Sequence, residues 1–132
     1  MTLDPASSNP ADTEPLARYL LSTSQFSVAN RRVKPSAFMP PADGTLSVFV
    51  VSGLSEDVVW DLGRTEVGDP QGKPIQGRAD VVVGVVRNPG LRLDVDNAPL
   101  RHANVIDWPP EKSEQKLKAE ILAEEALLRI RP

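Results

Sequence analysis

The sequence has no cysteine and only one histidine, His102, among its 132 residues. The absence of cysteine excludes disulfides and thiolate chemistry, and it fits a reducing compartment. One histidine without cysteine does not supply the usual ligands of a zinc site, so we expect neither a metal nor another cofactor. Aromatic residues are also scarce, at 5% of the chain. The core must therefore be built mainly from valine, leucine, isoleucine and alanine.

Long apolar runs are missing as well, since the longest covers only residues 81–86. Such a run is far too short to cross a bilayer, and we expect no membrane partner. The first residues lack the basic and apolar segments of a signal peptide, which favours a cytoplasmic location. The net charge of −3 argues against a nucleic-acid partner, because proteins that bind nucleic acids carry a basic surface.

The length suits a single domain, and a chain of this size can bury its own core. Residues 1–14 contain prolines and serines and almost nothing apolar. This composition predicts a flexible N-terminal tail, followed by one domain over residues 15–132. The thirteen prolines are about twice the usual share, and they limit where helices can run.

Two short helices are expected in the first half of the domain. Pro15 suits a first helical position, and the apolar residues that follow share a face, which predicts a helix over residues 15–21. Ser55 is a good N-cap for a helix over residues 56–62. Gly63 suits the left-handed conformation that often ends a helix.

The longest helix is expected at the C-terminal end, over residues 111–128. Leu117, Ile121 and Leu128 fall on one stripe, and Ala119, Leu122 and Ala126 widen it, which predicts the buried face of an amphipathic helix. The residues after this helix are expected to fray or to pair as a short edge strand.

Four segments favour extended structure: residues 25–33, 46–51, 91–95 and 100–106. Residues 79–87 are ambiguous, because their valines favour a strand whereas their spacing permits a helix, which we favour slightly. The expected fold is therefore α+β, with a small mixed or antiparallel sheet of about four strands and two to four helices, including the C-terminal amphipathic helix.

The most concentrated polar stretch is Arg101-His102-Ala103-Asn104. In a strand, His102 and Asn104 point to the same face. Histidine ordinarily changes its charge near neutral pH, so the pair suits general-base catalysis or the binding of an anion. The alternative is a half-buried histidine with a structural role. Four further residues are candidates for ligand contacts: Arg101, Lys34, Arg78 and Asp80.

A proline-framed loop over residues 34–41 carries Phe38 and Met39, which with Trp108 are candidates for binding a partner. Packing of Phe38 into the core is the alternative. Because no complete catalytic set is visible, we expect a small non-enzymatic interaction or regulatory protein that binds another protein, and a homodimer is left open. The alternative is a small enzyme, or a domain that binds an anionic, nucleotide-like ligand, at the face of His102 and Asn104.

Overall fold

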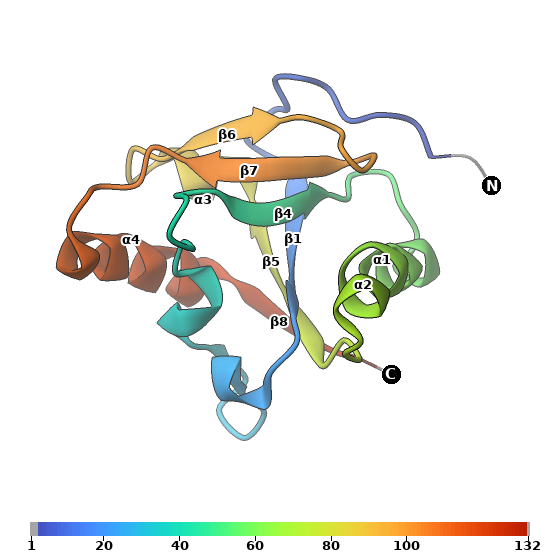
Figure 1. Cartoon of the computed structure of the whole chain (residues 1–132), viewed down its shortest axis with the longest axis horizontal. Helices are drawn as coiled ribbons and strands as arrows, with labels where there is room; N and C mark the ends of the chain where they lie inside the picture. Colours follow the sequence, from blue (N-terminus) through green and yellow to red (C-terminus); the bar gives the residue numbers. More distant parts are fainter. Residues whose placement is uncertain (1–2, 132) are drawn as a thin grey trace.

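Six antiparallel strands form the main sheet of the computed structural model, which describes residues 3–131 (Figure 1). Their order across the sheet is β6-β7-β4-β1-β5-β8. The strands are β1 (Pro15–Leu20), β4 (Leu46–Val50), β5 (Gly77–Val82), β6 (Arg92–Val95), β7 (His102–Ile106) and β8 (Leu127–Ile130). The α+β class is thus confirmed, but the main sheet has six strands rather than about four.

One face of the sheet, called the α4 face here, packs against α4 (Lys112–Glu125), the 3-10 helix η2 (Pro35–Phe38) and α3 (Val83–Arg87) (Figure 1). Strand side chains on this side join the helices in the larger of two apolar clusters. On the same side, a short 3-10 helix η1 (Thr23–Gln25) leads into a hairpin. This hairpin consists of β2 (Phe26–Ser27) and β3 (Arg32–Val33).

The opposite face, called the α1 face, is covered by a helical stretch that changes its winding along its length (Figure 1). The stretch consists of α1 (Glu56–Gly63), a π-helical turn η3 (Arg64–Gly68) and α2 (Asp69–Gln71). Beneath it lies the smaller apolar cluster, which contains Ala17, Tyr19, Phe49, Val51, Val59, Leu62 and Ile75. None of the helices within residues 3–131 has the length and apolar character that crossing a membrane requires.

The helix expected over residues 15–21 is wrong, because this segment forms the central strand β1. Leu16 and Leu20 are buried on the α4 face, whereas Ala17 and Tyr19 are buried on the α1 face. Hydrogen bonding to β4 on one side and β5 on the other satisfies the backbone. Burial on both faces therefore overrides the weak local preference for a helix.

The helix expected after Ser55 is confirmed in α1, where the Ser55 side chain accepts a hydrogen bond from the N–H of Val58. Gly63 is the last residue of α1 but is not the left-handed stop that was expected, since its φ of −62° is helical and the chain continues into η3 and α2. The stretch ends at Gly72, which has a φ of +63°. The reason for glycine at position 63 is packing, because a Cβ there would overlap the ring of Tyr19.

The ambiguous segment over residues 79–87 contains both structures. Strand β5 runs to Val82, and α3 begins at Val83. A helix over the first half is therefore wrong, because Ala79 and Val81 alternate into the core of a paired strand.

The C-terminal helix is confirmed in α4, and the residues after it form the edge strand β8. The predicted buried face is confirmed for Ala119 and Leu122 but is wrong in part, and α4 ends at Glu125, so that Leu128 belongs to β8. Ala119, Leu122 and Ala123 are the buried residues of α4, whereas Leu117 is 60% exposed and Ile121 is 37% exposed. Small alanine side chains allow α4 to approach η2 closely, and this approach sets which side of the helix faces the core.

Residues 3–14 lie along the domain, and Met1 and Thr2 lie outside the described residues. The flexibility expected for residues 1–14 stays a prediction. The Asn97 side chain accepts from the N–H of Ala6 (2.8 Å) and donates to its carbonyl oxygen (3.0 Å). Pro10 is fully buried. Composition did not reveal these contacts, because their partners lie far along the chain.

Candidate functional site

His102 opens β7, and its imidazole lies on the α1 face beside Phe49 of β4. The two ring centroids are 5.3 Å apart, with the planes at 74°. This edge-to-face contact holds the imidazole in place. The His102 side chain is 13% exposed, so one side of it remains open to a ligand.

Three side chains from different elements form a chain of hydrogen bonds at this position. Asp96 Oδ1 is 2.7 Å from His102 Nδ1, and His102 Nε2 is 3.0 Å from Ser47 Oγ. We call this the Ser47–His102–Asp96 array. Ser47 and His102 are diagonal neighbours across β4 and β7, a relation that brings polar side chains within reach. In enzymes that use a serine nucleophile, a hydroxyl, an imidazole and a carboxylate are hydrogen-bonded in this same order.

Asp96 is held in the ionised form. Partial burial acts to raise its pKa, but hydrogen bonds from His102, from the N–H of Ala98 and from the Asn104 amide outweigh burial and hold this pKa below its usual range. A carboxylate only accepts hydrogen bonds, so Nδ1 of His102 carries the hydrogen that is donated to Asp96. Nε2 of the neutral ring is then an acceptor for the Ser47 hydroxyl.

The turn between Asp96 and His102 contains a strained residue. Arg101 has a φ of +76°, a left-handed conformation that is costly for a residue with a side chain. Its backbone N–H donates to Asn97 Oδ1, and its guanidinium donates to the carbonyl oxygens of Val50 and Ser52. These bonds offset the strain and fix the turn. Arg101 therefore stabilises the turn that connects Asp96 with His102. Strain of this kind often accompanies functional sites.

A cavity of about 240 Å³ adjoins Ser47 and His102. It lies between the sheet and the helical stretch on the α1 face. Its lining residues are Arg18, Tyr19, Ser47, Phe49, Glu66, Val67, Gln71, Pro99 and His102. Glu66 and Val67 come from the π-helical turn η3, a type of turn that is frequent at functional sites.

Arg18 gives this cavity a positive charge. Its guanidinium donates to the carbonyl oxygens of Ala37 (2.9 Å) and Ser47 (3.0 Å). Burial lowers the pKa of Arg18 to about 10, so the side chain stays protonated at neutral pH. The positively charged Arg18 guanidinium is thereby held next to the backbone of Ser47.

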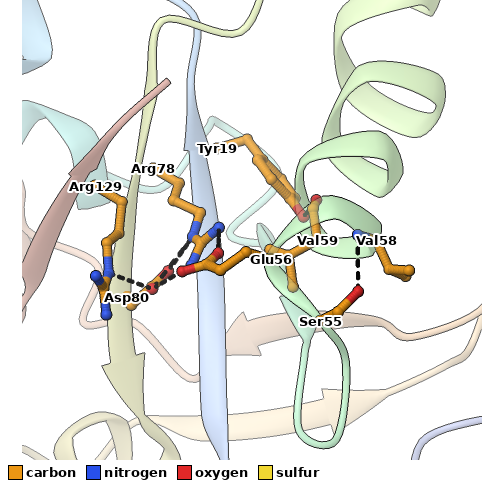
Figure 2. A network of polar contacts seen from close by, with 8 residues as sticks. All are labelled: Tyr19, Ser55, Glu56, Val58, Val59, Arg78, Asp80 and Arg129. Atoms are coloured by element: carbon orange, nitrogen blue, oxygen red, sulfur yellow. Dashed lines mark hydrogen bonds and ion pairs between the residues drawn. The ribbon is translucent and has the colours of Figure 1, made fainter. Parts of the chain in front are cut away.

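Arg78 and Asp80, predicted as ligand contacts, belong to a separate network between β5 and α1 (Figure 2). Arg78 is 4% exposed and donates three hydrogen bonds to the Asp80 carboxylate, of 3.0, 3.2 and 3.1 Å. Its Nη1 also lies 2.5 Å from Glu56 Oε2, and its guanidinium lies over the ring of Trp60. Strands β1 and β4 separate this network from β7. Arg78 and Asp80 therefore join α1 to the sheet and do not line the cavity.

The pKa values in this network follow from burial and pairing. The hydrogen bond from Arg78 lowers the pKa of Glu56, whereas burial raises the pKa of Asp80 against the pull of Arg78. Nearby, the Tyr19 hydroxyl donates to the carbonyl oxygen of Val59 at 2.5 Å (Figure 2). Burial, the largest cause, raises the pKa of Tyr19. The charges are thus largely satisfied within the chain.

The remaining predicted residues lie away from the cavity. Phe38 is 1% exposed and belongs to the core, and Met39 packs against the same cluster. Trp108 is half-buried and donates from its indole nitrogen to the carbonyl oxygen of Val105 (3.0 Å). Lys34 is exposed just before η2. Of the two roles considered for Phe38, binding a partner or packing into the core, the structure shows the second.

Of the predicted site residues, the structure brings His102 and Asn104 together through Asp96. Ser47 and Asp96 were missed. The alternation of β4 already places Ser47 on the face opposite Leu46, but only the pairing of β4 with β7 shows that Ser47 meets His102. That pairing joins segments far apart in the sequence.

Within residues 3–131 there is no group of three or more histidine, aspartate or glutamate side chains arranged to hold a metal ion. Comparisons of the chain with protein-family models, with curated proteins and with solved structures found no match.

Proposed function

We propose that the chain is a small hydrolase in which Ser47 is the nucleophile, His102 is the general base and Asp96 orients the imidazole. The observation that carries this proposal is the array itself, with contacts of 2.7 and 3.0 Å on the two ring nitrogens of His102. Protein binding is the first hypothesis from the sequence, but the array supports the alternative of a small enzyme at the face of His102 and Asn104.

The reaction follows from the hydrogen-bond order. Ser47 Oγ attacks the carbonyl carbon of a bound ester or amide, and its proton passes to His102 Nε2. The bond to the leaving group breaks, and His102 returns the proton to that group. Water then attacks the acyl–Ser47 ester and gives its proton to His102. The acid leaves, and the proton goes back to Ser47 Oγ. Asp96 stays ionised and stabilises the imidazolium that forms in each half of the reaction.

The cavity indicates a small substrate. Its volume of about 240 Å³ is below the usual range for drug-sized ligands. Tyr19, Phe49 and Val67 offer apolar walls for the acyl group. Arg18 supplies a fixed positive charge in the lining of the cavity, and such a charge stabilises the negative charge that develops on the carbonyl oxygen. A short-chain, uncharged ester or amide fits these features best.

The test is covalent labelling by a fluorophosphonate probe, with the modified peptide identified by mass spectrometry. We expect modification at Ser47, and at least about 100-fold slower labelling in Ser47→Ala and His102→Ala. Ser113→Ala, which removes an exposed hydroxyl from α4, is the matched control and should label as the wild type does. Circular dichroism checks that each variant is folded. Equal labelling of the wild type and Ser47→Ala would overturn the proposal.

A further inference from the structure

A groove of about 740 Å³ lies between the β2–β3 hairpin and α4, away from the catalytic cavity. We call it the hairpin–α4 groove. One wall comes from the hairpin and the start of η2, and the other comes from α4. The lining residues are Arg31, Arg32, Val33 and Pro35 on the first wall, and Leu117, Glu120, Ile121, Ala123, Glu124 and Ala126 on the second.

The groove is bordered by exposed apolar side chains. Leu117 is 60% exposed and Ile121 is 37% exposed, one helical turn apart on α4. Val28, in the turn of the same hairpin but outside the lining of the groove, is 61% exposed. Apolar side chains grouped beside a groove and rimmed by charges are typical of a surface that binds another protein.

The two walls carry opposite charges. Arg31 and Arg32 lie on the hairpin wall, and Glu120 and Glu124 lie on the α4 wall. No ion pair within 4 Å joins any of these four to another residue in the part of the chain that the structure describes. Each wall is therefore available to a partner that carries the opposite charge.

The charge order along α4 gives a second indication. Glu111 and Glu114 stand at its N-terminus, where acids are favourable, but Glu124 and Glu125 also end it, without a basic residue in the last turn. At this C-terminal end, the charge opposes the helix dipole, which favours acids at the N-terminus and bases at the C-terminus. Positive charges from outside the chain, placed near Glu124, would relieve the mismatch.

We propose that the hairpin–α4 groove is the interface of a symmetric homodimer. A two-fold rotation places the basic wall of one copy against the acidic wall of the other, and the same rotation makes the reciprocal contact. Two arginines then meet two glutamates at each of two equivalent places, with Leu117 and Ile121 packed between them. One surface thus provides both halves of the charge complementarity, which favours a second copy over an unrelated partner.

The two functional surfaces of the protein are separate. The α4 helix covers one side of the sheet and the α1–η3–α2 stretch covers the other (Figure 1). The hairpin–α4 groove belongs to the first side, whereas the cavity beside Ser47 lies under the helical stretch on the second. Dimerisation therefore leaves both cavities open, and hydrolysis and association are independent properties.

The test is the molar mass of the full chain in solution, measured by sedimentation equilibrium at micromolar concentrations. We expect a concentration-dependent approach to twice the 14.3 kDa of one chain. Arg31→Glu with Arg32→Glu places acids against the acids of the second copy, so association should weaken by about tenfold or more. Glu120→Arg with Glu124→Arg should weaken association to a similar extent, because it places arginines against Arg31 and Arg32 of the second copy.

Mixing the two double variants is the decisive experiment. In a mixed dimer, one contact joins the introduced acids to the introduced arginines, and the other retains the native charges. Association should therefore return to the wild-type strength.

The control variant is Arg64→Glu with Lys73→Glu, which changes the net charge by the same amount as the hairpin variant. Both positions line a separate pocket near α2, away from the groove and from the cavity beside Ser47.

This control should dimerise as the wild type does, and it should not rescue the α4 variant when the two are mixed. A monomeric wild type over the whole concentration range would overturn the proposal. A mixture of folded double variants that stays monomeric would show that the walls do not face each other in a dimer. Rescue by the control would show that net charge, rather than this groove, drives association.

Discussion

Ser47 Oγ lies 3.0 Å from His102 Nε2, although 55 positions separate the two residues in the sequence. The contact exists because β4 pairs with β7, which sets the two side chains diagonally on the α1 face. Each residue alone suits a structural role on a strand. Together with Asp96 they place an acceptor nitrogen against a hydroxyl that the proposed reaction must deprotonate.

Asp96→Asn tests the orienting carboxylate. An amide at this position can favour the other ring tautomer, with the hydrogen on Nε2, and His102 then no longer accepts the Ser47 hydroxyl. We expect the rate of probe labelling to fall by about 10³- to 10⁴-fold, with folding retained. Asp94→Asn, an exposed change on β6 with the same loss of charge, should leave the rate within about twofold. Equal rates in Asp96→Asn and the wild type would show that the carboxylate has no role.

Gly63→Ala tests the packing of α1 on the sheet. The added methyl group overlaps the Tyr19 ring, so we expect a loss of about 2–3 kcal/mol in the free energy of unfolding, measured in urea. In a Tyr19→Leu background the same change should cost much less, because the ring edge is gone. An equal cost in both backgrounds would mean that the overlap is not its source.

Arg78→Met tests the buried ion network. The change leaves the Asp80 carboxylate in a buried position without its main partner, so we expect a loss of about 3–5 kcal/mol in the free energy of unfolding. Arg129→Met is the control, because Arg129 is half-exposed and its Nε lies 3.8 Å from Asp80. Its cost should stay within about 1 kcal/mol in the same urea titration. Similar costs for the two variants would contradict the role given to Arg78.

Glu56→Gln tests the same network through pH. The hydrogen bond from Arg78 lowers the pKa of Glu56 in the folded chain. Its contribution to stability is therefore present above the ordinary glutamate range and is lost as pH falls through the lowered folded pKa. Glu56 is half-exposed, so we expect an advantage of about 1 kcal/mol for the wild type at neutral pH.

At acidic pH this advantage should vanish, as measured by urea unfolding of both proteins at each pH. Asp80 titrates in the same network with its pKa raised by burial, but it is present in both proteins, and its main effect cancels in the difference. A difference that stays constant down to strongly acidic pH would contradict the pairing of Glu56 with Arg78.

Local signals sufficed for much of the fold. Ser55 begins α1 as its capping chemistry predicts, and the valine-rich alternation after Leu46 predicts β4. For residues 15–21 the sequence predicts a helix, whereas the structure has β1. Over so few residues, the pair Leu16 and Leu20 fits one face of a helix as well as one face of a strand. Only the neighbouring strands decide between these two structures, and they lie far along the chain.

The candidate site was predictable only in part for the same reason. The polar pair His102 and Asn104 stands out in the sequence, and its shared face follows from strand alternation. Ser47 and Asp96 become meaningful only once the register of β4, β6 and β7 is known. Register is a property of the whole sheet, so no local pattern reveals it.

The position of β1 has a consequence for how the chain acquires its shape. Among the described strands this one is synthesised first, yet its two partners are residues 46–50 and 77–82, and β8, the outermost strand beyond β5, is the last of them. Closure of the sheet must therefore wait for distant segments, which places this protein among slow-folding topologies. Until β5 leaves the ribosome, β1 has an unpaired edge in the middle of the future sheet, and an unpaired strand edge is prone to association with other chains.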